Sequence, residues 1–457
     1  MLSRVIGPLA ALGLVLACAS RDPDGLALLG ATLIDGSGGP PLPHSVVVVR
    51  GGRIESVGTG DGFILPPRTT RVDVSGHWII PGLIDGHVHL IDPQAGVLAW
   101  SIPRYLAWGV TTVRDAHGPL ERILDLREKL DRGDRLGPRV YAAGSMIDGV
   151  PPTYPDAIPA ERAADARRAV DRLVSQGVDF IKLYTRIDRG LLLPIMDEVR
   201  TFNLRVSAHL GMVDARTAAR AGVSSIEHLS GIPEAVVGDP SGLYAAHARS
   251  FFAGWTASER AWASLDSAAL ADVAAELAEK RVVLVPTLVL HETMSRLDDS
   301  TTLRDSMYRA VPEFERQRWN VPDMVARAGW SREDFEGFRR SRPVQDRFLR
   351  EFVARGGLVA TGTDAANQLM VPGYGVHREL ELLVRAGLSP GEALVAATRN
   401  GAVLVGADSI GVVAPGKVAD LVILTRDPMA DIRNTTAIDR VMSRGRLWKP
   451  DSIPGVR

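Results

Sequence analysis

The sequence has little of what several classes of protein require. It holds one cysteine in 457 residues, which excludes an internal disulfide and a metal cluster held by thiolates. Lysine plus arginine total 53 and aspartate plus glutamate 54, so the net charge of −1 gives no electrostatic surface for nucleic acid. No segment reaches 18 uninterrupted apolar residues, so no membrane-spanning helix is expected. The 46% of hydrophobic residues is enough for one large globular domain or two ordinary ones.

The one cysteine lies at the end of a candidate export signal. A short basic start leads into an apolar run at residues 5–17, which is too short to span a bilayer but suits a signal peptide. The three residues before Cys18 resemble a bacterial lipoprotein cleavage box. We therefore predict that residues 1–17 are removed, that Cys18 carries the lipid, and that this anchor is the protein's membrane contact. An ordinary secretory peptide, cut a residue or two later, is the alternative.

This signal also predicts where the protein resides. A lipoprotein signal sends the chain across the inner membrane and anchors it in the periplasm. Ala19, rather than an aspartate, follows the cysteine, which favours the outer membrane.

The two ends of the remaining chain are rich in β-prone runs. Short runs at 26–33, 45–49, 53–57 and 72–80 are separated by glycine-rich turns, and similar runs return at 410–413, 419–425 and 439–442. Neither group is large enough to fold well by itself. We predict that 18–80 and 405–457 together form one small β-sandwich.

Between these ends, short apolar strands alternate with amphipathic helices, of which residues 161–176 are an example. This alternation predicts an α/β fold with parallel strands, and over residues 81–404 a (β/α)8 barrel. The eight candidate strands end near His89, Asp115, Ala143, Tyr184, Leu210, Leu229, Leu290 and Asp364.

Two long inserts interrupt this alternation. Residues 231–280 follow the sixth strand and 291–351 the seventh. Loops after the strands of a barrel lie at its active face, so both inserts are lid candidates. Ordinary barrel helices with surface additions are the alternative, and the role of the inserts stays open.

Six residues of metal-ligating type lie where candidate strands meet their loops: His87, His89, Lys182, His209, His228 and Asp364. The first two are two apart on a strand and therefore share a face. Imidazole and carboxylate groups are suitable ligands for Zn²⁺ and similar ions. Each residue alone has an ordinary structural explanation, but six at strand ends predict a metal site.

The lysine in this set needs a chemical explanation of its own. A buried ammonium group is costly unless it is paired, and beside two metal cations it would be repelled. Lys182 can instead react with CO₂ to form a carbamate, an anion that bridges two metals.

Three segments carry a resemblance to a known family. They are residues 72–89, which end in Asp85-Gly86-His87-Val88-His89, residues 109–115, and residues 393–422. The sequence resembles the amidohydrolase superfamily, and within it the branch of imidazolonepropionase-like and Xaa-Pro-dipeptidase-like enzymes. The resemblance covers nearly all of residues 26–447.

The resemblance implies roles for the six residues. His87, His89 and Asp364 would hold a more buried metal, and His209 and His228 a more exposed one. Carboxylated Lys182 and a hydroxide would bridge two divalent ions, with zinc expected and manganese as an alternative. Asp364 would also carry the proton during catalysis.

The surroundings of Lys182, at residues 179–182, match the binuclear dipeptidase-like members. Imidazolonepropionase is mononuclear and lacks this lysine, so we do not expect that activity. After the third strand many relatives carry a Gly-Gly-His element, whereas this chain has Gly149-Val150-Pro151-Pro152.

Further candidates lie near the predicted mouth. Tyr184 is two residues after Lys182 and shares its inward face, so it could bind a substrate oxygen, with packing as the equal alternative. The candidate catalytic residues are thus Asp364, Lys182 and Tyr184. Arg114 and Asp115 are adjacent, so one of them faces inward, in a structural ion pair. Secondary candidates for substrate contact are His117, His291 and His377.

The sequence therefore predicts a metal-dependent hydrolase of amide bonds. The expected substrate is a small molecule or dipeptide, which makes the enzyme a dipeptidase or an N-acyl amino acid hydrolase. Hydrolysis of a lactone, cyclic amide or xenobiotic amide at the same site is the first alternative, and a non-catalytic metal-binding lipoprotein is the second. An oligomer is compatible with the sequence, which leaves the substrate, the metal and the oligomeric state open.

Overall fold

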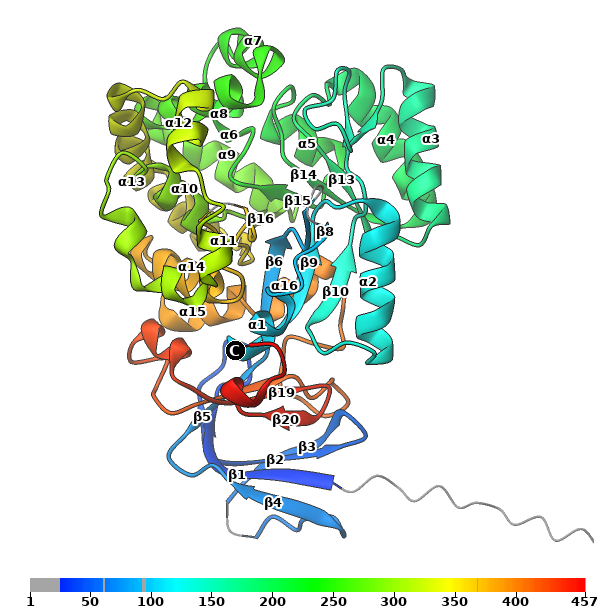
Figure 1. Ribbon diagram of the computed structural model, residues 1–457, viewed down its shortest axis with the longest axis vertical. Helices are drawn as coiled ribbons and strands as arrows, with labels where there is room; N and C mark the ends of the chain where they lie inside the picture. Colours follow the sequence, from blue (N-terminus) through cyan, green and yellow to red (C-terminus); the bar gives the residue numbers. More distant parts are fainter. Residues whose placement is uncertain (1–24, 61, 93–95, 368, 457) are drawn as a thin grey trace, which may run out of the picture.

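The structure is a computed structural model that describes residues 25–60, 62–92, 96–367 and 369–456. It has an α/β region and, at one end of it, a sheet domain (Figure 1). Cys18 and the predicted signal peptide at residues 1–17 lie outside the described residues. Within these ranges, no helix combines the length and hydropathy that a membrane crossing needs.

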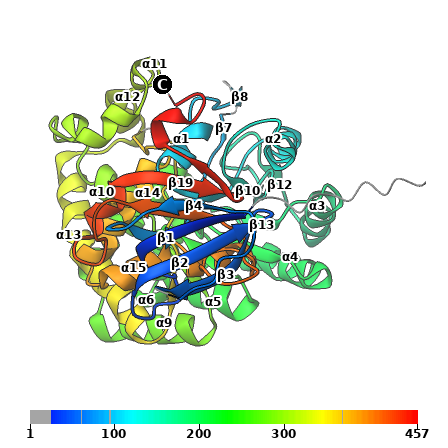
Figure 2. The ribbon, with the colours of Figure 1, turned by 90° about the horizontal axis from the view of Figure 1, so that it is seen from below.

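Both ends of the chain contribute to the sheet domain, as predicted. Its strands form one eight-stranded sheet in the order β20-β19-β18-β5-β1-β2-β3, with β4 paired to β1. The strands are β1(Gly25–Leu33), β2(Leu42–Arg50), β3(Arg53–Thr59), β4(Thr69–Asp73), β5(Trp78–Pro81), β18(Leu421–Leu424), β19(Ile438–Ser443) and β20(Arg446–Trp448). Viewed from below, this sheet lies across the helices of the α/β region (Figure 2).

Two of the predicted β runs do not form single strands, and the residues in and around them explain why. The predicted strand at 72–80 is two strands, because the Asp73 carboxylate accepts hydrogen bonds from the N–H and Oγ of Ser75 and closes a turn. Gly76 follows with a φ of +75°, which an extended strand does not allow. The run at 410–413 forms no strand, since Ile410 packs against Ile84 and Val413 N–H bonds to the carbonyl of Asp35.

The α/β region contains two parallel sheets. Their orders are β10-β9-β6 and β12-β11-β13-β14-β15-β16-β17, and every pair in them is parallel. The strands are β6(Leu83–Val88), β9(Val110–Asp115), β10(Arg139–Ala142), β11(Ile147–Asp148), β12(Ile158–Pro159), β13(Phe180–Leu183), β14(Arg205–Ala208), β15(Ser225–Glu227), β16(Val283–Val285) and β17(Leu358–Val359). The predicted α/β architecture with parallel strands is confirmed. A short antiparallel pair, β7(Ile91–Asp92) and β8(Gly96–Val97), follows β6.

The predicted end of the seventh strand near Leu290 is wrong. β16 ends at Val285, and α10(Leu288–Met294) begins after Thr287, whose φ is +47°. The buried carboxylate of Glu379 accepts hydrogen bonds from the N–H groups of Leu288 and Val289 at 2.9 and 2.7 Å. These bonds satisfy two of the free N–H groups at a helix start, so an apolar stretch that resembles a strand becomes a helix.

Helices pack around the parallel sheets. The predicted helix at 161–176 is α3, whose Ala166, Ala169, Val170 and Leu173 form its buried face. The helices outside the inserts are α1(Ile102–Ala107), α2(Leu120–Arg132), α3(Ala163–Ser175), α4(Arg189–Phe202), α5(Ala215–Ala221), α14(Tyr374–Arg385), α15(Pro390–Ala396) and α16(Arg399–Val405), with 3-10 turns η4(Ile432–Thr436) and η5(Pro450–Ser452) in the C-terminal part.

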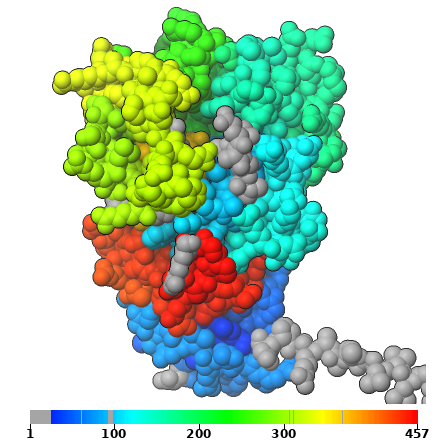
Figure 3. Space-filling view, in the orientation of Figure 1, coloured from blue at the N-terminus to red at the C-terminus, as the bar shows by residue number. Residues whose placement is uncertain are grey.

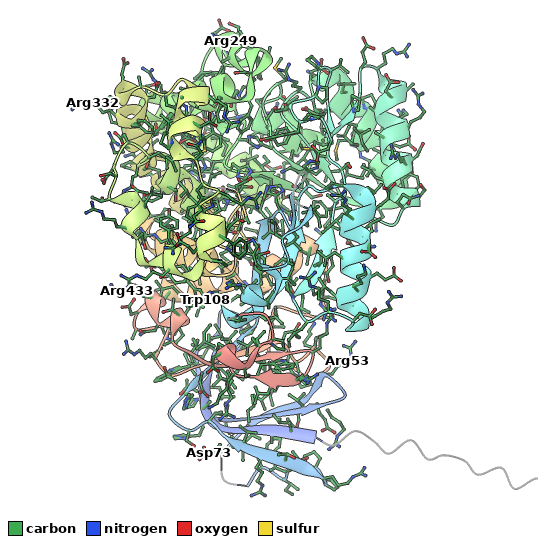
Figure 4. All side chains as sticks on the ribbon, viewed as in Figure 1. Arg53, Asp73, Trp108, Arg249, Arg332 and Arg433 are labelled. Atoms are coloured by element: carbon green, nitrogen blue, oxygen red, sulfur yellow. The ribbon has the colours of Figure 1, made fainter. Side chains whose placement is uncertain are left out.

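The two inserts lie at the end of the molecule opposite to the sheet domain. Arg249 of the first insert and Arg332 of the second are at that end, whereas Asp73 is at the other (Figure 4). The first insert forms α6(Ile232–Val236), α7(Ser241–Arg249), α8(Phe251–Ala261), η1(Trp262–Ser264) and α9(Ser267–Glu279). The second begins in α10 and forms η2(Thr302–Arg304), η3(Ser306–Ala310), α11(Glu313–Arg316), α12(Val321–Ala328) and α13(Arg332–Ala354), and its yellow part covers the upper left of the surface in Figure 3.

Candidate metal centre

The structure brings the six predicted metal-ligating residues together. Five of them lie in or directly after the C-terminal end of a parallel strand: His87, His89, Lys182, His209 and His228. Asp364 follows β17 by five residues, so the last strand ends earlier than predicted. The ring centres of His87 and His228 are 4.5 Å apart, and those of His209 and His228 are 4.8 Å apart. His89 is 5.4 Å from His87 by the same measure. Residues separated by as much as 277 positions thus meet in one cluster.

His87, His89 and Asp364 form one part of the cluster. Each offers one ligand atom, and these atoms lie within 4.8 Å of one another. His89 Nδ1 donates a hydrogen bond to the carbonyl of His117, which leaves Nε2 3.0 Å from Asp364 Oδ1. A side chain on Gly362 would place its Cβ 2.9 Å from His87 Cβ, so the close approach of these two segments requires a glycine.

His209 and His228 form the second part. His228 Nδ1 hydrogen-bonds Thr287 Oγ1 at 2.7 Å, which fixes the orientation of the ring. Burial, together with the charge of Lys182, holds the pKa of the His209 ring well below its usual range, and burial does the same for the pKa of His228. Both rings are therefore neutral near pH 7, which is the form that binds metal.

Lys182 is an unusual member of the cluster. Its side chain is 1% exposed, and Nζ has no hydrogen-bond partner among the residues that the structure describes. Burial lowers the pKa of this amine to about 8. Four imidazole rings, a carboxylate and an amine without a hydrogen-bond partner among the described residues form a donor set that fits divalent metal binding.

Glu227 is the residue that sequence reasoning missed. It is fully buried beside His228, and its carboxylate receives hydrogen bonds from His87 Nδ1 and Arg114 Nη2, both at 2.7 Å. The hydroxyls of Ser207 and Ser225 also donate to it. Burial would raise the pKa of Glu227, but Arg114, His87 and Lys182 hold it well below its usual range. A carboxylate inside an apolar strand, directly before a candidate ligand, was the available signal.

Arg114 and Asp115 take different partners. Arg114 forms the ion pair with Glu227 and also donates to the carbonyl of Gly86, so it faces the cluster. Asp115 accepts a hydrogen bond from the N–H of Leu90 at 2.7 Å.

Tyr184 lies beside His209 at the edge of the cluster. Its ring centre is 5.0 Å from that of His209 and 5.5 Å from that of Tyr154. Burial and the neighbouring Tyr154 keep the pKa of its hydroxyl well above the usual value, so it is a donor at any physiological pH. Tyr154 belongs to the loop that departs from the Gly-Gly-His pattern, and its place at the site depends on a fold that the sequence pattern did not reveal.

The three secondary histidines have structural partners. His117 Nε2 lies 3.1 Å from Asp156 Oδ2, and its carbonyl holds His89. His291 Nε2 donates to the backbone carbonyl of His228 at 3.1 Å, so it lies behind a candidate ligand. The expected position of His377 at the mouth is wrong, because α14 buries it against the carbonyl of Trp108 and the hydroxyl of Thr435 near the sheet domain.

Comparison with known proteins identifies this arrangement. Residues 78–448 match the family model described as Amidohydrolase family, a match that spans both parallel sheets and all six cluster residues. The chain belongs to the amidohydrolase family. It is a hydrolase that acts on carbon–nitrogen bonds.

Curated relatives of this amidohydrolase match it over different lengths. Ochratoxinase of Aspergillus niger is 23% identical over 508 aligned positions, which cover 96% of this chain and 90% of the relative. Adenine deaminase of Rubrobacter xylanophilus is 40% identical over 75 residues, but these are 16% of this chain and 12% of the relative.

Solved structures share the fold of the amidohydrolase over nearly its whole length. A candidate prolidase from Bifidobacterium longum has a TM-score of 0.70 at 26% identity, and covers 94% of this chain and 96% of its own. A Xaa-Pro dipeptidase with bound methionine in the active site has a TM-score of 0.67 at 20% identity, with coverage of 93% and 100%. Bottromycin amidohydrolase has a TM-score of 0.72 at 23% identity, with coverage of 96% and 89%. The predicted superfamily and its dipeptidase-like branch are confirmed.

Proposed function

We propose that this amidohydrolase uses two divalent metal ions to hydrolyse the amide bond of a dipeptide or an N-acyl amino acid. The observation that carries the proposal is that the six candidate ligands lie in one cluster, in which the buried Nζ of Lys182 has no hydrogen-bond partner among the described residues. The dipeptidase and amidohydrolases among the similar structures support the substrate class. A complete ligand set argues against the non-catalytic alternative.

The metal ligands divide by position. His87, His89 and Asp364 would hold the more buried ion, and His209 and His228 the more exposed one. When bound, two ions such as zinc or manganese lower the pKa of water and polarise the scissile carbonyl. Lys182 would bridge them as a carbamate. In that step its neutral Nζ forms a bond to the carbon of CO₂ and releases one proton to solvent, which leaves one negative charge on two oxygens.

The other roles belong to the protein's own side chains. Asp364 would accept the proton of the attacking water and pass it to the leaving amine. Glu227 fixes the ring of His87 and Thr287 that of His228, which aims the opposite nitrogen of each ring into the site. The Tyr184 hydroxyl, beside His209, would donate a hydrogen bond to a substrate oxygen.

We further propose that the parallel strands form a (β/α)8 barrel over residues 81–404. In support, Asp364 N–H donates to the carbonyl of His87 at 2.8 Å, which connects the last strand to the first. Asp179 N–H donates to the carbonyl of Ala142 at 2.9 Å, which connects the two sheets at the other side. For the sheet domain, at 18–80 and 405–457, buried side chains on both faces of β2 support a sandwich: Val47 belongs to one apolar cluster and Val48 to another.

The test of the metal site is the metal content measured beside activity. We expect the wild type to bind two ions per chain, and Lys182→Ala to lose at least one ion and most activity. Lys182→Arg should not recover either, because a guanidinium group does not form the carbamate. Added acetate or propionate should partly restore Lys182→Ala by occupying the bridge. Lys129→Ala, which removes an exposed lysine of α2, is the matched control.

One outcome would return the site to a mononuclear mechanism. It is a wild type that is fully active with one tightly bound ion, together with a Lys182→Ala variant that keeps that activity.

The test of the substrate class is a panel of dipeptides and N-acyl amino acids, offered to the protein with Zn²⁺ or Mn²⁺. Lactones, cyclic amides and xenobiotic amides form the second set of the panel. Turnover confined to this second set would replace the proposed substrate class. A metal-replete protein that turns over neither set would favour the non-catalytic alternative.

A further inference from the structure

Four aromatic side chains from three separate segments gather beside His209. Tyr184 directly follows β13, Tyr154 lies in the loop after β11, and Phe251 and Trp255 belong to α8. The ring centres of Phe251 and Trp255 are 5.9 and 6.4 Å from that of His209. Phe251 and Tyr184 are nearly parallel, with 15° between their planes and 6.2 Å between their centres. Tyr154 contacts both of these rings.

These rings differ from the aromatic residues of the core. Phe338, Phe348 and Phe352 are at most 2% exposed, whereas Tyr184, Phe251 and Trp255 are only partly buried and Tyr154 is 42% exposed. Apolar rings that face one another and yet stay accessible lose stabilisation that complete burial would give. A ligand that covers them would recover it.

The helix α8 presents two different faces through adjacent residues. Phe251 and Trp255 are four positions apart, so they share the face toward His209. Phe252 contacts the edge of Phe251 at 5.5 Å between ring centres but packs toward the second insert, where its ring centre is 5.9 Å from that of Trp330. The pair Phe251 and Phe252 therefore offers a natural comparison within one helix.

Trp255 also carries an unused donor. Its Nε1 is buried and has no hydrogen-bond partner within the described ranges, and the residue lines a cavity together with His209 and His228. The indole of Trp330, by contrast, donates to Thr256 Oγ1 at 2.8 Å. An unpaired buried N–H is costly, so an acceptor in the ligand would stabilise it.

We propose that Tyr154, Tyr184, Phe251 and Trp255 form an aromatic subsite that binds a flat apolar group next to the scissile amide, such as a phenylalanine side chain. Trp255 Nε1 donates a hydrogen bond to an oxygen of the same substrate. This inference rests on the proposed amide hydrolysis and specifies its substrate class. The first insert is then the element that selects the substrate.

The experiment compares alanyl-phenylalanine, phenylalanyl-alanine and alanyl-alanine as probes. We expect one of the two aromatic dipeptides to exceed alanyl-alanine by about 10-fold in kcat/KM, because stacking adds to the burial of the ring. Phe251→Ala should reduce this ratio to about 1. Phe252→Ala, the control, should keep it. Phe251→Leu serves as a second variant if Phe251→Ala folds poorly, as judged by circular dichroism.

If the wild type turns over none of the three probes, the proposed dipeptide hydrolysis fails but the subsite is still tested. Titration calorimetry then measures the affinity of the metal-loaded protein for the same probes, with the same expected ratios. Trp255→Phe keeps an aromatic ring but removes the Nε1–H donor, so it should weaken binding of the preferred probe. Trp330→Phe, the control, should not. Equal affinity for all three probes, or equal losses in Phe251→Ala and Phe252→Ala, would overturn the aromatic subsite.

Discussion

Glu227 connects two charged or ligating side chains beside the candidate metal centre. It is 0% exposed and holds His87 and Arg114 at the same time. A buried ion pair adds little net stability, but removal of one partner leaves the other charge buried and unpaired. We therefore expect Glu227 to affect both the stability of the folded protein and the orientation of the His87 ring.

We expect Glu227→Gln to lower the free energy of unfolding by about 3 kcal/mol, because the Arg114 guanidinium loses its counter-charge inside the protein. The change should also reduce bound metal, since the amide holds the His87 ring less firmly. Urea unfolding in the presence of a chelator measures the first effect, and metal analysis the second.

Asp125→Asn is the control for this prediction. Asp125 pairs with Lys129 on the surface of α2, where the two side chains are 56% and 49% exposed. Such pairs contribute about 1 kcal/mol or less. If the two variants lost the same stability, Glu227 would have no special structural role.

The sequence allowed the six cluster residues to be placed, because each stands at or shortly after the end of a strand whose apolar pattern is local. The roles of three other residues could not be predicted, for a common reason: Glu227, Thr287 and Tyr154. Their roles depend on neighbours that are 140, 59 and 30 residues away in the chain. Neither the residue type nor the spacing indicates such partners before the fold is known.

Among the elements, α14 joins the α/β region to the C-terminal part of the chain. It packs against η4, and His377 lies in the contact. The His377 ring donates from Nε2 to the carbonyl of Trp108 at 3.0 Å, and its Nδ1 lies 2.9 Å from Thr435 Oγ1, whose hydroxyl donates to the carbonyl of Ile432. Burial in this contact favours the neutral ring.

This contact should weaken at low pH. Burial lowers the pKa of His377 from 6.5 to about 4, so between these values the unfolded chain binds a proton that the folded protein rejects. The contribution of the neutral His377 ring to the free energy of unfolding is complete above pH 6.5 and falls as the pH decreases toward 4. The total loss is about 3 kcal/mol. His377→Gln should flatten the dependence of the unfolding free energy on pH in this range. His44→Gln, at an exposed position, should leave it unchanged, and equal slopes in all three proteins would contradict the prediction.

The bounds of helices and strands were harder to predict from the sequence than their types. The apolar residues after Pro286 fit a strand or a helix equally well by pattern alone. The choice is made by Glu379, which lies 91 residues further along and holds Leu288 N–H at the start of α10. The turn at Asp73 is local, and its Asp-x-Ser-Gly pattern was a readable signal for the break between β4 and β5.

At the scale of the whole molecule, we propose that Cys18 anchors the protein to a membrane through lipid. Cys18→Ser should then release soluble protein or stall removal of residues 1–17. Fractionation of cells, followed by a wash in high salt, measures the distribution. A Cys18→Ser protein that still sediments with membranes after the wash would exclude the anchor.

The pairing of β5 with β18 has a consequence for the time at which the protein can fold. Ile80 of β5 is paired with Val422 of β18. The sheet that β1 to β5 begin therefore lacks one of its central strands until the ribosome has synthesised β18. Contacts between such distant segments form slowly. The N-terminal strands thus lack this partner while the rest of the chain emerges, and such a delay would suit the export across a membrane that the proposed Cys18 anchor implies.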